Sequence, residues 1–432
     1  MKPWRGDTRR IAANIAKLPD SCAEDVQGRH PLTQCLWRAH IVDVINIEAT
    51  AMPYPTMSKA TVRTTPAQKV LLVLGASLLM LVFLGAGELY FRWFMRINFQ
   101  GTSRDMFIAQ KFGDSYGNAS DYEGISFGAK FRTDQNGFRI DPTFRDPASN
   151  IAVLILGDSV AFGPGVEESK TFVGLLRRSM PNVRFYNSST IGYGLHDYAN
   201  VVEQFVSLKP EIKYVLLFYC LNDVSDVSAQ QVVQTLSGLQ EADQADQDRF
   251  ASLGYRFTSI QSAIHSLNVY LRSRSKFYLF LKGALTDPAM RYFKQDLAEY
   301  QKGNDHVTAS LRPLEEIAKK LAARRITFEV FVMPYEAQVR TMVQANLLPQ
   351  RMVDGFLRRN EIDYYDPAEK FMNSGIIAED LYLYGDPMHL SEKGHRLVSE
   401  IVGGELARMM ARPVEGGREP VIRAGLAARN QT

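Results

Sequence analysis

The stretch 151–165, IAVLILGDSVAFGPG, constrains the fold of this chain more than any other part of its sequence. Residues 151–156 are all apolar, and such a run ending at a glycine is typical of a strand buried on both faces of a parallel sheet. A tight turn follows at 157–159. Open α/β sheets place their active sites at the carboxyl ends of strands, so Ser159 in this turn is a candidate nucleophile. The alternative is that Ser159 only caps the helix that follows.

Strand and helix patterns alternate from residue 151 onward. Strands are predicted at 151–156, 183–187, 214–219 and 326–333, with a weaker one at 364–365. Helices are predicted at 171–179, 198–208, 311–325, 338–345, 350–360 and 392–409. This alternation predicts an α/β domain over 151–410, with a parallel sheet covered by helices on both faces.

The composition excludes several classes of protein. A net charge of +3 over 432 residues provides no basic surface for nucleic acid. The three cysteines, Cys22, Cys35 and Cys220, are too few and too scattered for a disulfide framework. No cysteine and histidine cluster has metal-ligand spacing.

Residues 70–87 contain no charged side chain and are followed at once by aromatic residues, which predicts a single transmembrane helix. A cleaved signal peptide is the alternative, but its cleavage site would be poor and the apolar run is too long. The slight excess of basic residues before the run favours the N-terminus inside the cell. The large domain would then lie outside the cytoplasm, in the periplasm of a bacterial cell.

The segments around this helix are less patterned. Residues 1–69 are predicted to be a disordered tail, or to precede the natural start, because Met57 opens a basic, acid-free segment of the kind that begins a membrane-targeting N-terminus. The natural start would then be Met52 or Met57. Residues 88–150 are interpreted as a juxtamembrane connector. Its segment 131–139 is predicted to be a strand that enters a turn, with Gly137 available for a positive φ, and to form an edge element that leads into the main domain.

Two further segments lie within or after the α/β domain. Residues 225–301 form a helical insertion, which is either a lid or substrate platform or an excursion without a role in chemistry. The tail 411–432 is rich in arginine, glycine and proline and is predicted to be disordered.

One histidine of the seven stands out as a possible base. His389 lies in a loop just ahead of the last predicted helix, and Asp386 precedes it by three residues. On a turn this spacing lets the carboxylate reach one edge of the imidazole while the other edge faces a serine. His395, at the start of the helix, is expected to serve packing or to be exposed.

Two other strand ends offer donors for a developing oxyanion. Gly192 follows the strand 183–187, and a glycine there lets its backbone N–H point outward. Asn222 follows the strand 214–219 and presents a side-chain amide.

The blocks Gly157-Asp158-Ser159, Gly192, Asn222-Asp223 and Asp386-Pro387-Met388-His389 occur in this order at successive strand ends. This pattern resembles the GDSL/SGNH hydrolase family over 151–404. The resemblance implies a flavodoxin-like three-layer α/β/α sandwich, with Ser159 as nucleophile, His389 as base and Asp386 as its orienting carboxylate. It also implies an oxyanion hole made by the N–H groups of Ser159 and Gly192 and the side chain of Asn222. It implies no metal or organic cofactor.

The chain departs from the family pattern in two places. Val160 replaces the leucine of the first block, a conservative change. Cys220 replaces the glycine of the third block, which affects the pose of Asn222. Cys220 itself ends a buried strand with no histidine placed beside it, so it is not expected to be a nucleophile.

These patterns predict a membrane-anchored serine esterase that removes O-acetyl or other small acyl groups from a cell-envelope or exported polysaccharide. The alternatives are an O-acyltransferase with the same triad, a lipase or thioesterase whose aromatic stretch 267–285 covers a long acyl chain, and a non-catalytic envelope scaffold. The expected partners are an ester-bearing carbohydrate or lipid and, through one helix, the membrane.

Overall fold

The computed structural model describes residues 65–145, 147, 149–225 and 259–411. Most of the predicted N-terminal tail, both candidate start residues, the first part of the insertion and nearly all of the C-terminal tail lie outside the described residues. The chain divides into two compact units, 1–74 and 75–432. Apart from the first residues of helix α3, the elements below belong to the second unit.

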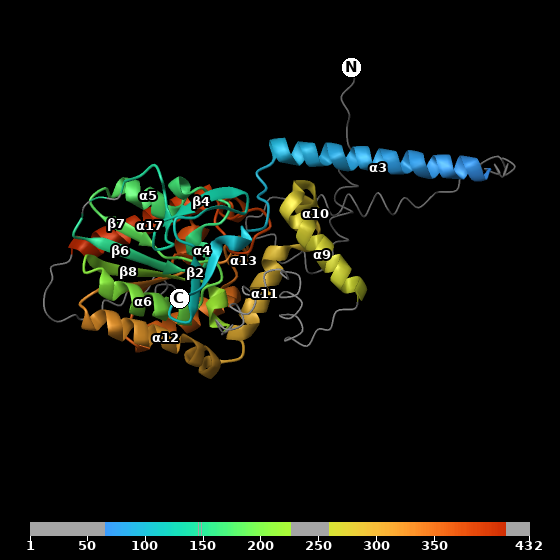
Figure 1. Ribbon diagram of the computed structural model, residues 1–432. Coiled ribbons are helices and arrows are strands. Elements are labelled where there is room, and N and C mark those ends of the chain that lie inside the picture. Colours follow the sequence, from blue (N-terminus) through green and yellow to red (C-terminus); the bar gives the residue numbers. More distant parts are fainter. Residues whose placement is uncertain (1–64, 146, 148, 226–258, 412–432) are drawn as a thin grey trace, which may run out of the picture. The chain divides into compact units, whose positions relative to one another are not determined.

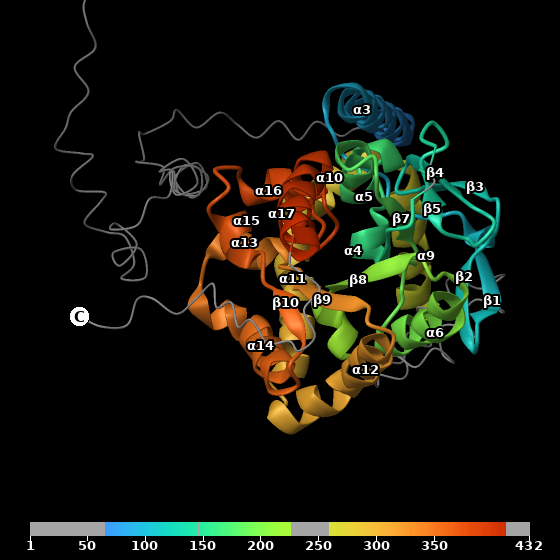
Figure 2. The ribbon, with the colours of Figure 1, turned by 90° about the vertical axis from the view of Figure 1, so that its left-hand side faces the viewer.

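An eight-stranded sheet forms the centre of the second unit, in the order β10-β9-β8-β6-β7-β5-β4-β3. Its strands are β3 (Glu123–Ser126), β4 (Ala129–Thr133), β5 (Arg139–Ile140), β6 (Ala152–Gly157), β7 (Arg184–Asn187), β8 (Ile212–Tyr219), β9 (Thr327–Val332) and β10 (Asp363–Tyr365). The strands from β6 to β10 run parallel, whereas β5, β4 and β3 pair antiparallel. In Figure 2, β3, β4 and β5 lie on the opposite side of β8 from β9 and β10.

Helices cover both faces of this sheet. Helices α5 and α17 pack together on one face, and α6 and α12 pack together on the other (Figure 1). The main helices of the domain are α4 (Ser159–Phe162), α5 (Phe172–Ser179), α6 (Leu195–Phe205), α12 (Asn304–Ala323), α13 (Glu336–Thr341), α14 (Leu348–Arg359), α15 (Ala368–Met372), α16 (Ala378–Leu381) and α17 (Glu392–Ala411). The parallel strands have the flavodoxin-like order, so the predicted three-layer α/β/α class is confirmed.

The predicted strands of the sheet correspond to β6, β7, β8, β9 and the short β10, each within two residues at its ends. The central residues of β6, β8 and β9 are almost completely buried, which explains why largely apolar runs mark these strands, whereas the residues of β10 are only partly buried. The segment 88–150 does more than connect. Its strands β3, β4 and β5 extend the main sheet by antiparallel pairing, while β1 (Phe107–Phe112) and β2 (Ser115–Asn118) form a separate hairpin.

Helix α3 (Pro66–Phe94) is longer than the predicted span 70–87 and is long and apolar enough, by length and composition, to cross a membrane. Its far end contacts the insertion. The Glu88 carboxylate accepts hydrogen bonds from the Ser275 hydroxyl at 2.7 Å and from the backbone N–H of Phe277 at 3.2 Å. Phe91 also stacks on Phe280 with ring centroids 4.3 Å apart. Glu88 therefore accepts hydrogen bonds from backbone N–H groups at the start of helix α10 (Lys276–Thr286).

The described part of the segment 225–301 consists of α9 (Ser259–Arg274), α10 (Lys276–Thr286) and α11 (Pro288–Tyr300). Helices α9 and α10 contact each other, whereas α11 packs against α12, α13 and α14. The insertion is thus joined to the α/β domain through α11.

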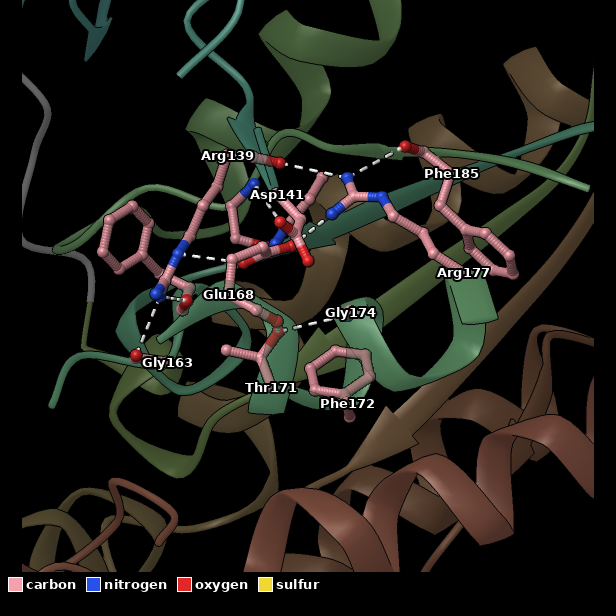
Figure 3. Close-up of polar contacts among 12 residues, drawn as sticks. Arg139, Asp141, Gly163, Glu168, Thr171, Phe172, Gly174, Arg177 and Phe185 are labelled. Atoms are coloured by element: carbon pink, nitrogen blue, oxygen red, sulfur yellow. Dashed lines mark hydrogen bonds and ion pairs between the residues drawn. The ribbon is translucent and has the colours of Figure 1, made fainter. Parts of the chain in front are cut away.

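A buried ionic cluster joins β5 to helix α5 and to the segment between α4 and α5 (Figure 3). Arg139 and Arg177 both form ion pairs with Glu168, and all three side chains are at most 4% exposed. Arg139 also donates to the carbonyl oxygens of Phe162 and Gly163, which end helix α4. The cluster therefore fixes the end of the short helix that begins with Ser159.

Candidate active site

Ser159 is the first residue of helix α4, directly after the central strand β6. Asp158 is the N-cap, because its side chain accepts a hydrogen bond from the backbone N–H of Val160 at 2.8 Å. The turn needs a glycine at 157, since a Cβ there would lie 2.6 Å from the Cβ of Ala161. The capping role weighed for Ser159 thus belongs to Asp158, and the Ser159 side chain is left for other contacts.

Three side chains from the first and last sequence blocks meet in one row. The Nε2 of His389 lies 2.8 Å from the Oγ of Ser159, and its Nδ1 lies 2.8 Å from the Oδ2 of Asp386. The other oxygen of Asp386 accepts the backbone N–H groups of Met388 and His389 at 3.0 and 2.8 Å. Asp386 is thereby fixed, and it holds the imidazole with its far nitrogen toward the serine.

His389 and Asp386 each shift the pKa of the other. Burial opposes the charged form of His389, but the carboxylate of Asp386 outweighs it and raises the pKa of His389 above its usual value. Burial alone would raise the pKa of Asp386, yet His389 and the two backbone N–H groups lower it. Asp386 is therefore an anion that stabilises an imidazolium at His389.

The loop that carries His389 is held at several points. Leu383 donates its N–H to the carbonyl of His389 at 2.9 Å, which closes the loop on itself. Tyr382 donates its hydroxyl to the carbonyl of Pro334 at 2.7 Å, in the loop after β9. These bonds attach the loop to the same sheet edge that carries Ser159.

The two predicted oxyanion donors follow the strands on either side of β6. Gly192 lies in the turn after β7 with φ of 84°, and Asn222 lies in a 3-10 helix, Leu221–Val224, after β8. Strands β7 and β8 are the parallel neighbours of β6, so their carboxyl ends adjoin the end of β6. Gly192 also has no room for a side chain, because a Cβ would lie 2.7 Å from the hydroxyl of Tyr116.

Asp158 brings a second carboxylate to this edge. Burial raises its pKa, while the N–H of Val160, the charge of His389 and a hydrogen bond from the Asn222 side chain act in the opposite direction. The Asn222 amide thus reaches the residue next to Ser159. Sequence reasoning assigned Asp158 no separate role, although its place as a helix cap could have been read from the Gly-Asp-Ser turn.

Cys220 is completely buried, and burial raises the pKa of its thiol far above its usual value. Its Sγ contacts the Sδ of Met388 at 3.7 Å, so it packs under the loop of His389. A thiol in this state is a poor nucleophile. His395 is also fully buried, and burial lowers its pKa to about 3.

A pocket of about 160 Å³ opens beside His389. One side is the loop 384–389, and the opposite side is formed by residues of α9, α10 and α11. Phe127 also lines it, with its ring edge-to-face against His389 at a centroid distance of 5.2 Å. Phe127 lies in the two-residue turn between β3 and β4 and has φ of 47°. A primed turn of this kind fits a two-residue hairpin and directs Phe127 toward the histidine.

Within the described ranges, no group of three or more histidine, cysteine or carboxylate side chains is placed to hold a metal ion. Sequence reasoning missed Phe127, and it considered the stretch 267–285 only as cover for an acyl chain, without a role for its basic residues Arg272 and Lys282. No motif marks them, since each reaches the site only through tertiary contacts.

No family model matches the sequence, and no curated protein matches it. Several solved structures are similar in fold. A lipolytic protein of the G-D-S-L family from Veillonella parvula is 12% identical, covers 60% of this chain and 99% of its own, and has a TM-score of 0.34. A lipase/acylhydrolase from Enterococcus faecalis is 13% identical, with 60% and 96% covered and a TM-score of 0.35.

A variant of an acetylxylan esterase from Geobacillus stearothermophilus is 14% identical, with 63% of this chain and 100% of that chain covered, and has a TM-score of 0.33. The chain resembles the GDSL/SGNH hydrolase family in the order of the four sequence blocks. It also resembles the family in the position of these blocks, which lie together at the carboxyl edge of the parallel strands.

Proposed function

We propose that this protein is a serine hydrolase that cleaves ester bonds, with Ser159 as nucleophile. The observation that carries the proposal is the row from Asp386 through His389 to Ser159, with both contacts at 2.8 Å. Such a row lets the imidazole take the serine proton as the hydroxyl attacks a carbonyl carbon. It would be an unusual arrangement for a protein that only binds.

The reaction proceeds in two halves. The Oγ of Ser159 attacks the ester carbonyl while His389 accepts its proton at Nε2, and Asp386 stabilises the imidazolium. His389 then gives the proton to the departing alcohol, which leaves an acyl group on Ser159. Water, deprotonated by His389, attacks the carbonyl carbon of this acyl-enzyme. The bond to the Oγ of Ser159 then breaks, His389 returns the proton to Oγ, and the acid is released.

The oxyanion of each half needs preorganised donors. We assign this role to the backbone N–H groups of Ser159 and Gly192 and to the side chain of Asn222. Support comes from the strand order, which puts β7 and β8 on either side of β6. The φ of 84° at Gly192 further supports a turn shaped to present a backbone N–H.

We further propose that α3 is a single membrane anchor and that the catalytic domain lies outside the cytoplasm. Apolar side chains of α3 are exposed, as Leu79 at 72% and Phe83 at 66% illustrate, and such a surface calls for lipid rather than water. An anchored esterase outside the cytoplasm meets the polymers of the cell envelope. A polysaccharide that carries O-acetyl or other small acyl esters is therefore the proposed substrate.

The test uses the full-length protein in detergent. We expect the wild type to hydrolyse p-nitrophenyl acetate and to react with a fluorophosphonate probe, and Ser159→Ala to lose the probe reaction and at least about 10³-fold in kcat. Ser179→Ala, which changes an exposed serine at the end of α5, is the matched control and should behave as wild type. Equal activity of Ser159→Ala and wild type would refute the nucleophile.

A further inference from the structure

The pocket beside His389 carries two basic side chains that come from the insertion. Arg272 lies on α9 and Lys282 on α10, and both line the same cavity of about 160 Å³ as Asp386 and His389. This cavity is next to the bond that the proposed serine hydrolase would break. A charged group placed there would contact the rest of the substrate rather than the reacting atoms.

Each basic side chain is held by a neutral amide. Lys282 donates from Nζ to the Oδ1 of Asn268 at 3.2 Å, and Arg272 donates from Nε to the Oε1 of Gln100 at 2.6 Å. An amide oxygen orients a cation without neutralising its charge. Among the residues that the structure describes, no carboxylate forms an ion pair with either one.

The single carboxylate among the described residues of the pocket wall is Asp386. Its oxygens already accept the imidazole of His389 and two backbone N–H groups, so it is committed to the catalytic row. The pocket therefore has an excess of positive charge that its own walls do not compensate.

The titration of Lys282 agrees with this geometry. Burial lowers its pKa to about 8, and the charges of Arg272 and Arg291 act in the same direction. A lysine with an acidic partner would be shifted the other way. The remaining wall is largely apolar, with Leu279, Pro288 and Tyr292, so an anion that enters is also partly removed from water.

We propose that Arg272 and Lys282 form a subsite for an anionic group, a carboxylate or a phosphate, on the molecule that carries the ester. This inference rests on the proposed function and makes its substrate more specific, an ester on an acidic carrier rather than on a neutral one. The guanidinium and the ammonium bind the anionic oxygens and hold the ester against Ser159. The two basic residues are thus specificity determinants of the pocket.

The first test compares full-length variants on three acetyl esters. They are methyl 4-acetoxybenzoate, which is neutral, 4-acetoxybenzoate, which carries a carboxylate, and 4-acetoxyphenyl phosphate; the corresponding 3-isomers probe a second distance. The measured quantity is the kcat/KM for a charged ester divided by that for the neutral ester. Because each variant is compared with wild type, the different reactivities of the esters cancel.

We expect Lys282→Gln to lower this ratio about 10-fold or more, the size of one charge-assisted hydrogen bond, and Lys282→Arg to keep most of it. Arg272→Gln should lower it similarly. The matched control is Lys294→Gln, an exposed lysine on α11, which should leave the ratio at the wild-type value. Selective loss with the carboxylate or with the phosphate identifies which anion the subsite takes.

An unchanged ratio in Lys282→Gln, or an equal fall for neutral and charged esters, would overturn the subsite while leaving the hydrolase intact. A second measurement separates the two proposals entirely. Ser159→Ala protein is titrated with 4-acetoxybenzoate and 4-acetoxyphenyl phosphate in a calorimeter, with and without Lys282→Gln. We expect binding of at least one of them that the second substitution weakens about 10-fold. Equal binding to both proteins would refute the subsite whatever the activity of Ser159.

Discussion

Two groups of basic side chains surround the nucleophile turn, and they differ in what balances their charge. Arg139 and Arg177 share the carboxylate of Glu168 in a cluster with almost no exposure. Arg272 and Lys282 line a pocket and are held by the amides of Gln100 and Asn268. The first group has a buried carboxylate as its counter-charge, which two guanidinium groups share. Among the residues that the structure describes, the second group has no carboxylate partner.

This difference distinguishes basic residues that stabilise the fold from basic residues that could bind an anionic group. A buried ion pair whose partners also donate to carbonyls fixes backbone, as Arg139 does at the end of helix α4. A cation oriented by an amide keeps its attraction for an incoming anion. Loss of a charge should therefore have opposite consequences in the two places.

The largest change in stability is expected in the buried ionic cluster of Arg139, Arg177 and Glu168. Glu168→Gln leaves two buried guanidinium groups without a counter-charge, so the free energy of unfolding should fall by about 3–5 kcal/mol. The measurement is urea unfolding of the detergent-solubilised protein, followed by circular dichroism. Glu392→Gln removes an exposed ion pair with Lys170 and serves as control, with a loss of at most about 1 kcal/mol. Equal losses in both variants would show that the cluster is not a support.

A change of pH is expected to have an intermediate effect, which is a change in the ratio of kcat/KM between anionic and neutral esters. The pKa of Lys282 is about 8, so its charge is present below that pH and is lost above it. Arg272 on α9 and Arg291 on α11 act on it and stay charged, and His389 and Asp386 of the same pocket affect charged and neutral esters alike. The ratio of kcat/KM should therefore fall as the pH rises through about 8. A flat ratio in wild type would contradict the assignment, whereas Lys282→Arg should give a flat ratio.

The smallest effect, and one of opposite sign, is expected from Lys282→Met. Removal of an unbalanced cation from a partly buried position removes a desolvation cost while the methylene chain is replaced. The free energy of unfolding should stay level or rise by less than about 1 kcal/mol. The same urea titration measures it. A loss comparable with that of Glu168→Gln would show that Lys282 supports the fold.

The edge of the sheet could be predicted from the sequence because it depends on local signals. The strands β6 and β8 are continuous apolar runs over most of their length, and Ser159, Gly192 and Asn222 each lie within five residues of the end of a parallel strand. The pairing of His389 with Asp386 follows from their spacing on a turn. Four blocks in order thus indicated both the sheet and the row of side chains.

The pocket could not be predicted in the same way. Phe127 reaches His389 because the short strands β3 and β4 join the main sheet. The predicted edge strand that begins at 131 overlaps β4, but β3 and the turn that carries Phe127 were not predicted. Arg272 and Lys282 belong to helices whose place beside the site depends on packing of α9 and α10 against distant residues such as Gln100. The composition of 267–285 suggested a cover for an acyl chain, but basic residues on helices are common on protein surfaces, so it did not indicate that Arg272 and Lys282 share a pocket.

The separation of Ser159 and His389 along the chain determines when, during synthesis, the two side chains of the proposed catalytic row can meet. The two residues that meet at 2.8 Å are 230 positions apart, and Asp386 and His389 come close to the end of the described domain. A ribosome must therefore make almost the whole domain before the serine acquires its base. Under the proposed function, a chain that ends before His389 therefore carries an ordinary hydroxyl at Ser159 and does not hydrolyse esters.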